Sequence, residues 1–312
     1  MITNPGSGGN KKGIGEVRKF LAQNPGIHYG EAVIPDDINA LLADFSARNI
    51  ELLVVNGGDG TVQATLTALY SRSLFASPPI LALLQAGTTS MLARDVGVRG
   101  KPVAALEKIC AWSKDTARNK RHIHERPVLK VSQRDNPDAI CGMFLGAGAI
   151  PVGIEICHGS MNPNGLRGEL VPGLIIARFL LAALTGNDKL LPATDINICI
   201  DETEAGQNSY LFAMVSTLER LFLGLHPFWG RGPGPLHFTA LQSKPHCLLR
   251  NLPSLLRGRS TMTATPENGY ISHNARRIIL DFVGKFTLDG EIFEAKSPLT
   301  IEAAGPARFL RI

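Results

Sequence analysis

Residues Leu52 to Thr61 read LLVVNGGDGT, an apolar run that leads directly into three glycines within four positions. The first four residues have the composition of a strand buried in a parallel sheet. In residues 62–70, which follow, the apolar side chains recur on one helical face. The stretch therefore predicts a strand, a glycine loop and a helix, and the rest of the chain is interpreted around it.

The glycine loop has the properties of a phosphate-binding loop. Gly57, Gly58 and Gly60 allow the backbone to adopt positive φ and to approach a ligand closely. Thr61 is expected to cap the following helix, whose first N–H groups attract phosphate. Asp59 would repel phosphates unless a divalent cation or a donor hydroxyl lies between them, which indicates Mg-nucleotide chemistry. A plain Asp-Gly turn is the alternative, but a hairpin would need a second strand where a helical pattern follows.

Composition limits the class of protein. The chain has 312 residues, of which 44% are hydrophobic and 19% charged, so it is long enough for two domains of a soluble protein. Its net charge of +5 suits anionic lipid headgroups or nucleotides, and no nucleic-acid motif accompanies it. The five cysteines form no CxxC pair, which argues against a zinc site and a secreted disulfide framework. Without a signal-peptide pattern, a cytosolic setting is expected.

The first 115 residues alternate between strand and helix patterns. Helices are predicted over residues 15–23, 38–45 and 102–112, and strands over residues 27–33 and 80–84. Such alternation predicts a parallel α/β sheet. Two further loops could bind ligand at its carboxyl edge, because ligands gather there in open α/β sheets. One is Asn4 to Lys12, for which a phosphate grip and a solvated loop both remain open, and the other is the turn at Gly87 and Thr88.

The second half of the chain has a different pattern. Short apolar runs separated by Gly, Pro and Asn turns predict an antiparallel β domain, interrupted by a helix near residues 174–184. The basic crossing, residues 118–126, is either a solvated linker or a site that attracts headgroups. Near the end, Asp289-Gly290-Glu291 is either a tight hairpin with an outward glutamate or a turn that displays a catalytic base.

Four motifs together resemble the diacylglycerol kinase catalytic family, specifically its bacterial soluble lipid kinases. That family is similar to sphingoid-base kinases and shares its nucleotide fold with NAD kinases and phosphofructokinases. The motifs occur in the family's order over nearly the whole length, and they are NPGSG at residues 4–8, GGDGT at 57–61, the Gly-Thr turn at 87–88 leading to Ala93-Arg94, and DGE at 289–291.

The resemblance implies an α/β fold followed by a β fold. Residues 1–120 would form a three-layer parallel α/β nucleotide-binding domain to which residues 298–312 return, and residues 121–297 an antiparallel β-sandwich that binds the lipid acceptor. The general base of the family maps to Glu291, with Asp289 beside it, and Asp59 is expected to act in catalysis and to hold Mg2+. The residues expected to contact ATP are Asn4, Gly57, Gly58, Gly60, Thr61, Gly87 and Thr88.

Two departures from the family pattern stand out. Ser90 and Met91 occupy positions where the third motif has two polar residues, and residues 231–236 contain no carboxylate where the family has an Asp-Gly pair feeding a structural magnesium site. We therefore expect no structural metal in the second domain. The first strand is also short, so the true start could lie upstream.

The activity expected from the resemblance is transfer of the γ-phosphoryl group of Mg-ATP to the hydroxyl of diacylglycerol or a related lipid alcohol, in phospholipid metabolism. The expected partners are ATP and a lipid at an anionic membrane, without nucleic acid, and the protein would be cytoplasmic and peripherally membrane-associated. Homodimer formation and the identity of the acceptor stay open. The alternatives are an NAD kinase-like small-molecule kinase, which should carry a downstream Asn-Glu pair, and a catalytically weak lipid- or nucleotide-binding protein.

Overall fold

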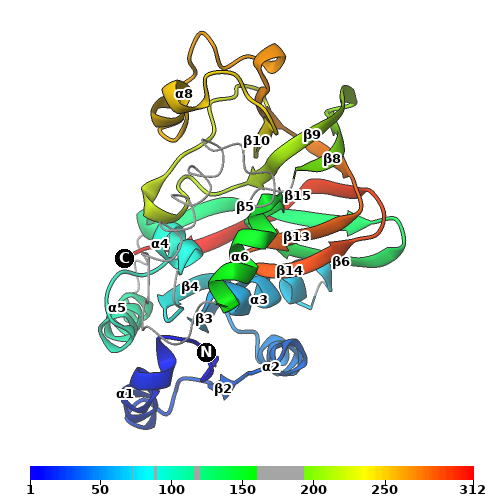
Figure 1. Cartoon of the computed structure of the whole chain (residues 1–312). Coiled ribbons are helices and arrows are strands. Elements are labelled where there is room, and N and C mark those ends of the chain that lie inside the picture. The colour runs from blue at the N-terminus through cyan, green and yellow to red at the C-terminus, as the bar shows by residue number, and fades with distance from the viewer. Residues whose placement is uncertain (73, 88–89, 116–119, 160–192) are drawn as a thin grey trace. The chain divides into compact units, whose positions relative to one another are not determined.

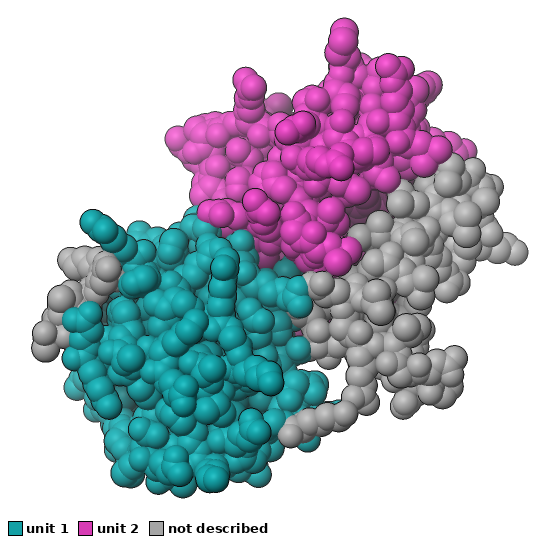
Figure 2. Space-filling view, turned by 90° about the vertical axis from the view of Figure 1, so that its left-hand side faces the viewer, with its two compact units in different colours: residues 1–128, 305–312 teal, residues 129–304 magenta. Residues whose placement is uncertain are grey.

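The computed structural model describes residues 1–72, 74–87, 90–115, 120–159 and 193–312. The chain divides into two compact units, residues 1–128 with 305–312 and residues 129–304, which Figure 2 colours separately. The helix predicted near residues 174–184 lies outside the described residues. No helix among those described is long and apolar enough to cross a membrane.

Unit 1 begins with alternating strands and helices, as the sequence predicts (Figure 1). In chain order they are β1 (Ile2–Thr3), α1 (Asn10–Ala22), β2 (Gly30–Glu31), α2 (Pro35–Ala47), β3 (Leu52–Gly57), α3 (Asp59–Ser71), β4 (Ile80–Gln85), α4 (Met91–Val96) and α5 (Pro102–Lys114).

The strands of unit 1 form one parallel sheet in the order β4, β3, β1 and β2, and Phe309 near the end of the chain pairs with Leu81 of β4. One buried apolar cluster of unit 1 contains side chains of α1, α5 and the strands β3 and β4. Helices α2 and α3 pack against each other. The predicted parallel α/β fold is confirmed.

Three details of unit 1 differ from expectation. Helix α1 begins at Asn10, five residues before the predicted start, because the Asn10 and Lys11 amides donate to the Ser7 carbonyl and close the first turn within the glycine-rich loop. The strand predicted over residues 27–33 is reduced to β2. Helix α2 begins at Pro35, three residues before the predicted start, because proline suits the first helical position and the Asp37 carboxylate accepts the amides of Val33 and Ile34.

Unit 2 consists mainly of antiparallel strands. It is reached from unit 1 through a short 3-10 turn, η1 (Lys120–His122), and β5 (Ile123–Gln133), whose residues up to Val128 belong to unit 1. The last residues of the predicted basic crossing therefore belong to a strand. The remaining elements are β6 (Asn136–Gly142), β7 (Phe144–Gly148), α6 (Ala149–Gly159), β8 (Thr194–Ile200), β9 (Thr203–Ser216), η2 (Phe222–Gly224), β10 (Leu236–Gln242), α8 (Leu248–Leu255), η3 (Pro266–Asn268), β11 (Tyr270–Ala275), β12 (Arg277–Asp281), β13 (Gly284–Leu288), β14 (Glu291–Ala295) and β15 (Leu299–Leu310).

The pairing within unit 2 runs β14, β13, β7, β9, β8, β12, β15, and β9 also pairs with β10, which pairs with β11. One cluster of buried apolar side chains in unit 2 includes Tyr210, Phe238 and Phe286, and a second cluster surrounds Leu255 and Tyr270. A β-rich antiparallel unit after the α/β unit confirms the predicted fold class.

Candidate active site

Three loops meet at the carboxyl edge of the unit 1 sheet. Strands β1, β3 and β4 run parallel, with Thr3 opposite Asn56 and Gly57 opposite Gln85, so all three end at one level. The loops that follow are residues 4–9, residues 57–60 and the described residues 86, 87 and 90, and we call them the first, second and third loops. They contain five of the predicted nucleotide-binding positions, which are Asn4, Gly57, Gly58, Gly60 and Gly87, and Thr61 follows the second loop.

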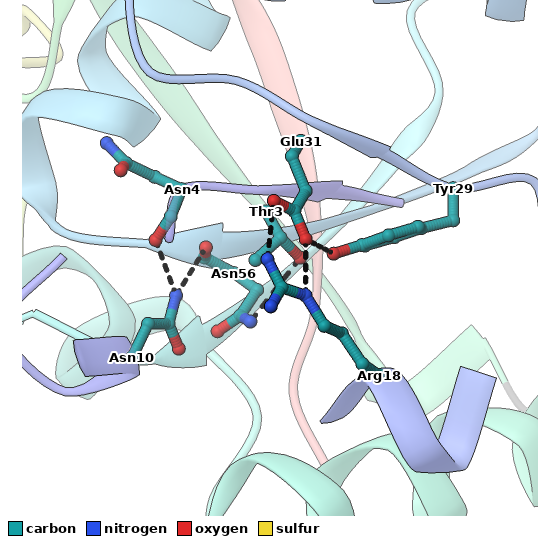
Figure 3. Close-up of polar contacts among 7 residues, drawn as sticks. All are labelled: Thr3, Asn4, Asn10, Arg18, Tyr29, Glu31 and Asn56. Atoms are coloured by element: carbon teal, nitrogen blue, oxygen red, sulfur yellow. Dashed lines mark hydrogen bonds and ion pairs between the residues drawn. The ribbon is translucent and has the colours of Figure 1, made fainter. Parts of the chain in front are cut away.

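A buried amide ties the first loop to β3. The Asn10 side chain is 1% exposed, and its Nδ2 donates to the carbonyl oxygens of Asn4 at 2.8 Å and Asn56 at 3.2 Å (Figure 3). The Asn4 amide also donates to the Asn56 carbonyl, at 2.9 Å. The Asn4 side chain is engaged as well, because its Nδ2 donates to Thr61 Oγ1 at 3.1 Å and its Oδ1 accepts the Gly6 amide. Asn10 was not predicted as a site residue.

The third loop lies against the other two at distances that require glycine. The Gly9 amide donates to the Ala86 carbonyl at 2.8 Å, and a Cβ on Gly9 would lie 2.7 Å from that oxygen. A Cβ on Gly87 would lie 2.8 Å from the Gly58 Cα. Such contacts leave no room for a side chain, so the glycines let three stretches of backbone form one continuous surface.

Helix α3 presents its first turn to this surface. Its N-cap is Gly58, and no side chain caps it, so the expectation that Thr61 caps the helix is wrong. Thr61 lies within the first turn, where its side chain is directed to Asn4 and would clash with a Cβ on Gly57 at 2.5 Å. An uncapped N-terminus of a 13-residue helix carries partial positive charge, which favours a bound phosphate group.

Asp59 connects the second loop to α4. Its carboxylate accepts the Met91 amide at 2.9 Å and the Leu92 amide at 3.1 Å, so it caps α4 from a distant part of the chain. Although the residue as a whole is only partly buried, the carboxyl group is enclosed, and this burial raises its pKa; the two amides and the positive charge of Arg94 oppose that rise. The dominant effect of burial favours the neutral form.

This geometry bears on the expectation that Asp59 holds Mg2+. Mg2+ is usually held by one or two carboxylates together with phosphate and water oxygens. Each oxygen of the Asp59 carboxylate accepts one backbone amide and has a second lone pair. The metal role expected of Asp59 stays a prediction.

The third loop ends in an unusual conformation. Ser90 has a φ of 47°, a left-handed value uncommon outside glycine, and its Oγ accepts the Gly87 amide at 2.9 Å. The next residue, Met91, donates its amide to Asp59. Ser90 and Met91, the two residues that depart from the third motif, thus contribute a hydroxyl and a backbone amide to the contacts of this loop. Thr88 lies outside the described residues.

A charged cluster holds α1 beside β2 (Figure 3). The Arg18 guanidinium donates to both Glu31 oxygens at 2.8 Å, and the Tyr29 hydroxyl donates to one of them at 2.6 Å. Arg18 lowers the pKa of Glu31, while burial, followed by the bond to Glu31, raises the pKa of Tyr29 to about 12. Because Arg18 lies on α1, the cluster helps to fix the helix that carries Asn10.

In unit 2, the Asp289-Gly290 pair forms a two-residue hairpin turn between β13 and β14. Both residues have positive φ, 51° and 90°, and Leu288 pairs with Glu291 across the turn. Asp289 is 2% exposed, and its carboxylate accepts the amides of Met143 and Phe144 at 2.8 to 3.1 Å. Glu291 is exposed. The two carboxylates thus point to different surroundings, and Asp289 anchors the turn that displays Glu291.

We expect Asp289→Asn to lower the free energy of unfolding by about 2 kcal/mol, because both buried amides would lose a charged acceptor and the Met143 amide would face an N–H group in place of one oxygen. Asparagine tolerates positive φ, so the turn itself should be little strained. The matched control is Asp201→Asn, since Asp201 also has positive φ and accepts two amides, those of Arg276 and Arg277, but is less buried. Urea unfolding measures both variants, and equal losses would contradict an anchoring role for Asp289.

The comparisons with known proteins agree with this arrangement. Residues 1–119 match the family model of the diacylglycerol kinase catalytic domain, so the resemblance drawn from the motifs is confirmed for this part of the chain. Residues 1–119 are thus similar to the catalytic domain of a kinase family. A search of the curated proteins gave no significant match.

Solved structures share the fold over almost the whole chain. A diacylglycerol kinase from Bacillus anthracis str. Sterne is 17% identical, with a TM-score of 0.62 over 99% of this chain and 94% of that one. A second protein of that organism, provisionally assigned as a diacylglycerol kinase, is 19% identical, with a TM-score of 0.65 over 97% and 93% of the two chains. At these identities the likeness concerns the fold.

Proposed function

We propose that this protein is a lipid kinase that transfers the γ-phosphoryl group of ATP to a hydroxyl of diacylglycerol or a related lipid alcohol. The observation that carries the proposal is the set of three loops joined at the carboxyl edge of the unit 1 sheet, in the residues that match the diacylglycerol kinase catalytic domain. Such an edge is where open α/β sheets bind nucleotides.

The loops supply what a triphosphate needs. The close approach of the glycine backbones leaves no room for side chains between the loops, and the start of α3, which has no side-chain cap, would offer its first N–H groups to a phosphate. Asn10 and Asp59 position this surface, the first through the carbonyls of Asn4 and Asn56 and the second through the start of α4. In phosphoryl transfer, positioning and electrostatic stabilisation provide most of the catalysis.

Glu291 is the proposed general base. A lipid hydroxyl loses its proton as its oxygen bonds to phosphorus, and a carboxylate placed at an exposed turn can accept that proton. Asp289 fixes the turn through the amides of Met143 and Phe144, so we assign it a positioning role. Mg2+ would supply charge neutralisation at the phosphates when bound, and none of the contacts described above is assigned to it.

The proposed setting follows from the substrate. A diacylglycerol resides in a bilayer, so the enzyme would be cytoplasmic and peripherally associated with an anionic membrane. The net charge of +5 supports such an association, because anionic leaflets attract basic proteins.

Product identification tests the proposal. The full chain is incubated with Mg-ATP and, separately, with diacylglycerol, a sphingoid base, a prenol and NAD, and the products are analysed by mass spectrometry. We expect a phosphorylated lipid. Phosphorylation of NAD alone would replace the proposal with an NAD kinase, and ATP binding without any phosphorylated acceptor would indicate a binding protein.

A further inference from the structure

The positive charge of this chain is concentrated in one segment. Residues 220–266 contain six Lys and Arg side chains and no Asp or Glu, whereas the rest of the chain has 26 basic and 27 acidic side chains (32 − 6 and 27 − 0). The excess charge of the whole protein therefore belongs to this acid-free segment. All six basic residues are exposed: Arg220, Arg231, Lys244, Arg250, Arg257 and Arg259.

Four of these residues lie in the connection between β10 and β11, which contains α8 and which we call the α8 loop, residues 243–269. Figure 1 shows it projecting beyond β10, on the side of unit 2 away from β13 and β14. Because β11 pairs only with β10 among the described strands, the loop extends from an edge of the sheet. Its basic side chains form no ion pair with a described carboxylate.

The α8 loop is nevertheless held in place. Asn251 is 1% exposed, and its Oδ1 accepts the hydroxyls of Thr261 at 2.8 Å and Thr263 at 2.7 Å. Leu255 packs into a buried cluster with Leu241 and Tyr270. The surface of the loop is therefore ordered before it meets a partner, which lowers the entropy cost of binding.

Apolar side chains lie exposed among the basic ones. Leu249 is 53% exposed and Met262 98%. Six large apolar side chains are exposed among the described residues, and a third one, Leu223, also lies in the acid-free segment. The stretch around Leu223 is joined to the α8 loop by a hydrogen bond from the His226 amide to the Leu256 carbonyl. A surface that combines arginine with exposed apolar side chains suits the interface of an anionic bilayer. The headgroups neutralise the arginine charges, and the acyl region buries the apolar side chains.

We propose that the α8 loop is the membrane-docking surface of this protein, with Arg250, Arg257 and Arg259 contacting anionic headgroups and Leu249 and Met262 entering the acyl boundary. The inference rests on the proposed function in that a lipid acceptor gives docking its use. A nucleic acid would match the charge but would leave Leu249 and Met262 without apolar partners, so the bilayer is the favoured occupant.

Vesicle sedimentation of the full chain tests this surface, without ATP and without any phosphorylation step. Vesicles are made of phosphatidylcholine alone or with about one third phosphatidylglycerol. R250Q/R257Q/R259Q should lower partition into the anionic vesicles about 100-fold, because each lost charge contributes about 1 kcal/mol of binding free energy. The partition of this variant should also depend less on salt concentration than that of the wild type. The matched control R72Q/R99Q/K101Q removes three exposed charges from unit 1 and should change partition less than about threefold.

A second variant, L249S/M262S, tests the apolar part. This variant should lower partition into the anionic vesicles about tenfold, and its partition should depend on salt as strongly as that of the wild type. Unfolding curves that match the wild type show that the variants remain folded. Equal losses in the arginine variant and its control, or no loss in either, would overturn the inference. If the protein binds duplex DNA more strongly than vesicles, and the arginine variant abolishes that binding, the inference is also overturned, because the surface would then bind nucleic acid.

The two proposals can fail separately. If no lipid is phosphorylated but vesicle binding follows the three arginines, the docking surface stands and the kinase function falls. If diacylglycerol is phosphorylated while vesicle binding ignores these arginines, the docking inference alone is overturned.

Discussion

Glu291→Gln should lower the turnover number by roughly two to four powers of ten while the affinity for ATP changes less than about twofold. Glutamine keeps the shape of the side chain and removes the basicity that would accept the proton of the acceptor hydroxyl. Because Glu291 is exposed at the start of β14, the substitution should cost little stability. Steady-state kinetics with saturating lipid and an ATP-binding titration provide the two readouts.

The matched control is Glu294→Gln, the same change at another exposed position of the same strand. It should leave turnover within about twofold of the wild type. A Glu291→Gln variant that loses ATP binding but keeps its turnover at saturation would make Glu291 a nucleotide ligand or a turn residue, and the assignment of the base would be wrong.

Asp59→Asn should lower turnover by at least about 100-fold in a protein that remains folded. Asparagine offers one acceptor oxygen and an N–H group, so one of the Met91 and Leu92 amides would face a donor. The start of α4 would then move, and with it the third loop, which is joined to it through Ser90 and Gly87. Kinetic assays with thermal unfolding separate this effect from global destabilisation.

Asp37→Asn is the control, because the Asp37 carboxylate also accepts two backbone amides but lies outside the three loops. It should retain turnover within about threefold. Activity of Asp59→Asn within that same range would contradict a positioning role for Asp59.

Because the pKa of Asp59 is raised, the difference in stability between Asp59→Asn and the wild type should depend on pH in a definite direction. Folding favours the protonated carboxyl, so the stability it contributes is fully present below its ordinary pKa and is lost as pH rises through the raised folded value. Asparagine does not ionise. The stability of the variant relative to the wild type should therefore increase over that pH range.

The fold was largely predictable because its signals are local. The apolar run at residues 52–55 and its glycine loop are contiguous in sequence, and period and turn chemistry report on such segments directly. The Asp-Gly turn of the last hairpin is a similar case, since both positions adopt the positive φ that the pair favours.

The contacts that shape the candidate site were not predictable in the same way. Asn10 acts through the carbonyls of Asn4 in the first loop and Asn56 on β3. Asp59 and Asp289 act through amides 32 and 146 residues away. No local periodicity encodes such distant partners. The one available signal for Asn10 was an asparagine directly after a glycine-rich turn that begins with another asparagine, which is also the composition of an ordinary loop.

The central claim is that this chain phosphorylates a lipid hydroxyl, and one measurement tests it most directly. ATP labelled at the γ-phosphate is incubated with the full chain and anionic vesicles containing diacylglycerol, and label is counted in the extracted lipid. We expect label in phosphatidic acid at a rate that Glu291→Gln reduces at least about 100-fold. Label found only in inorganic phosphate, or lipid labelling that is unchanged by Glu291→Gln, would contradict it.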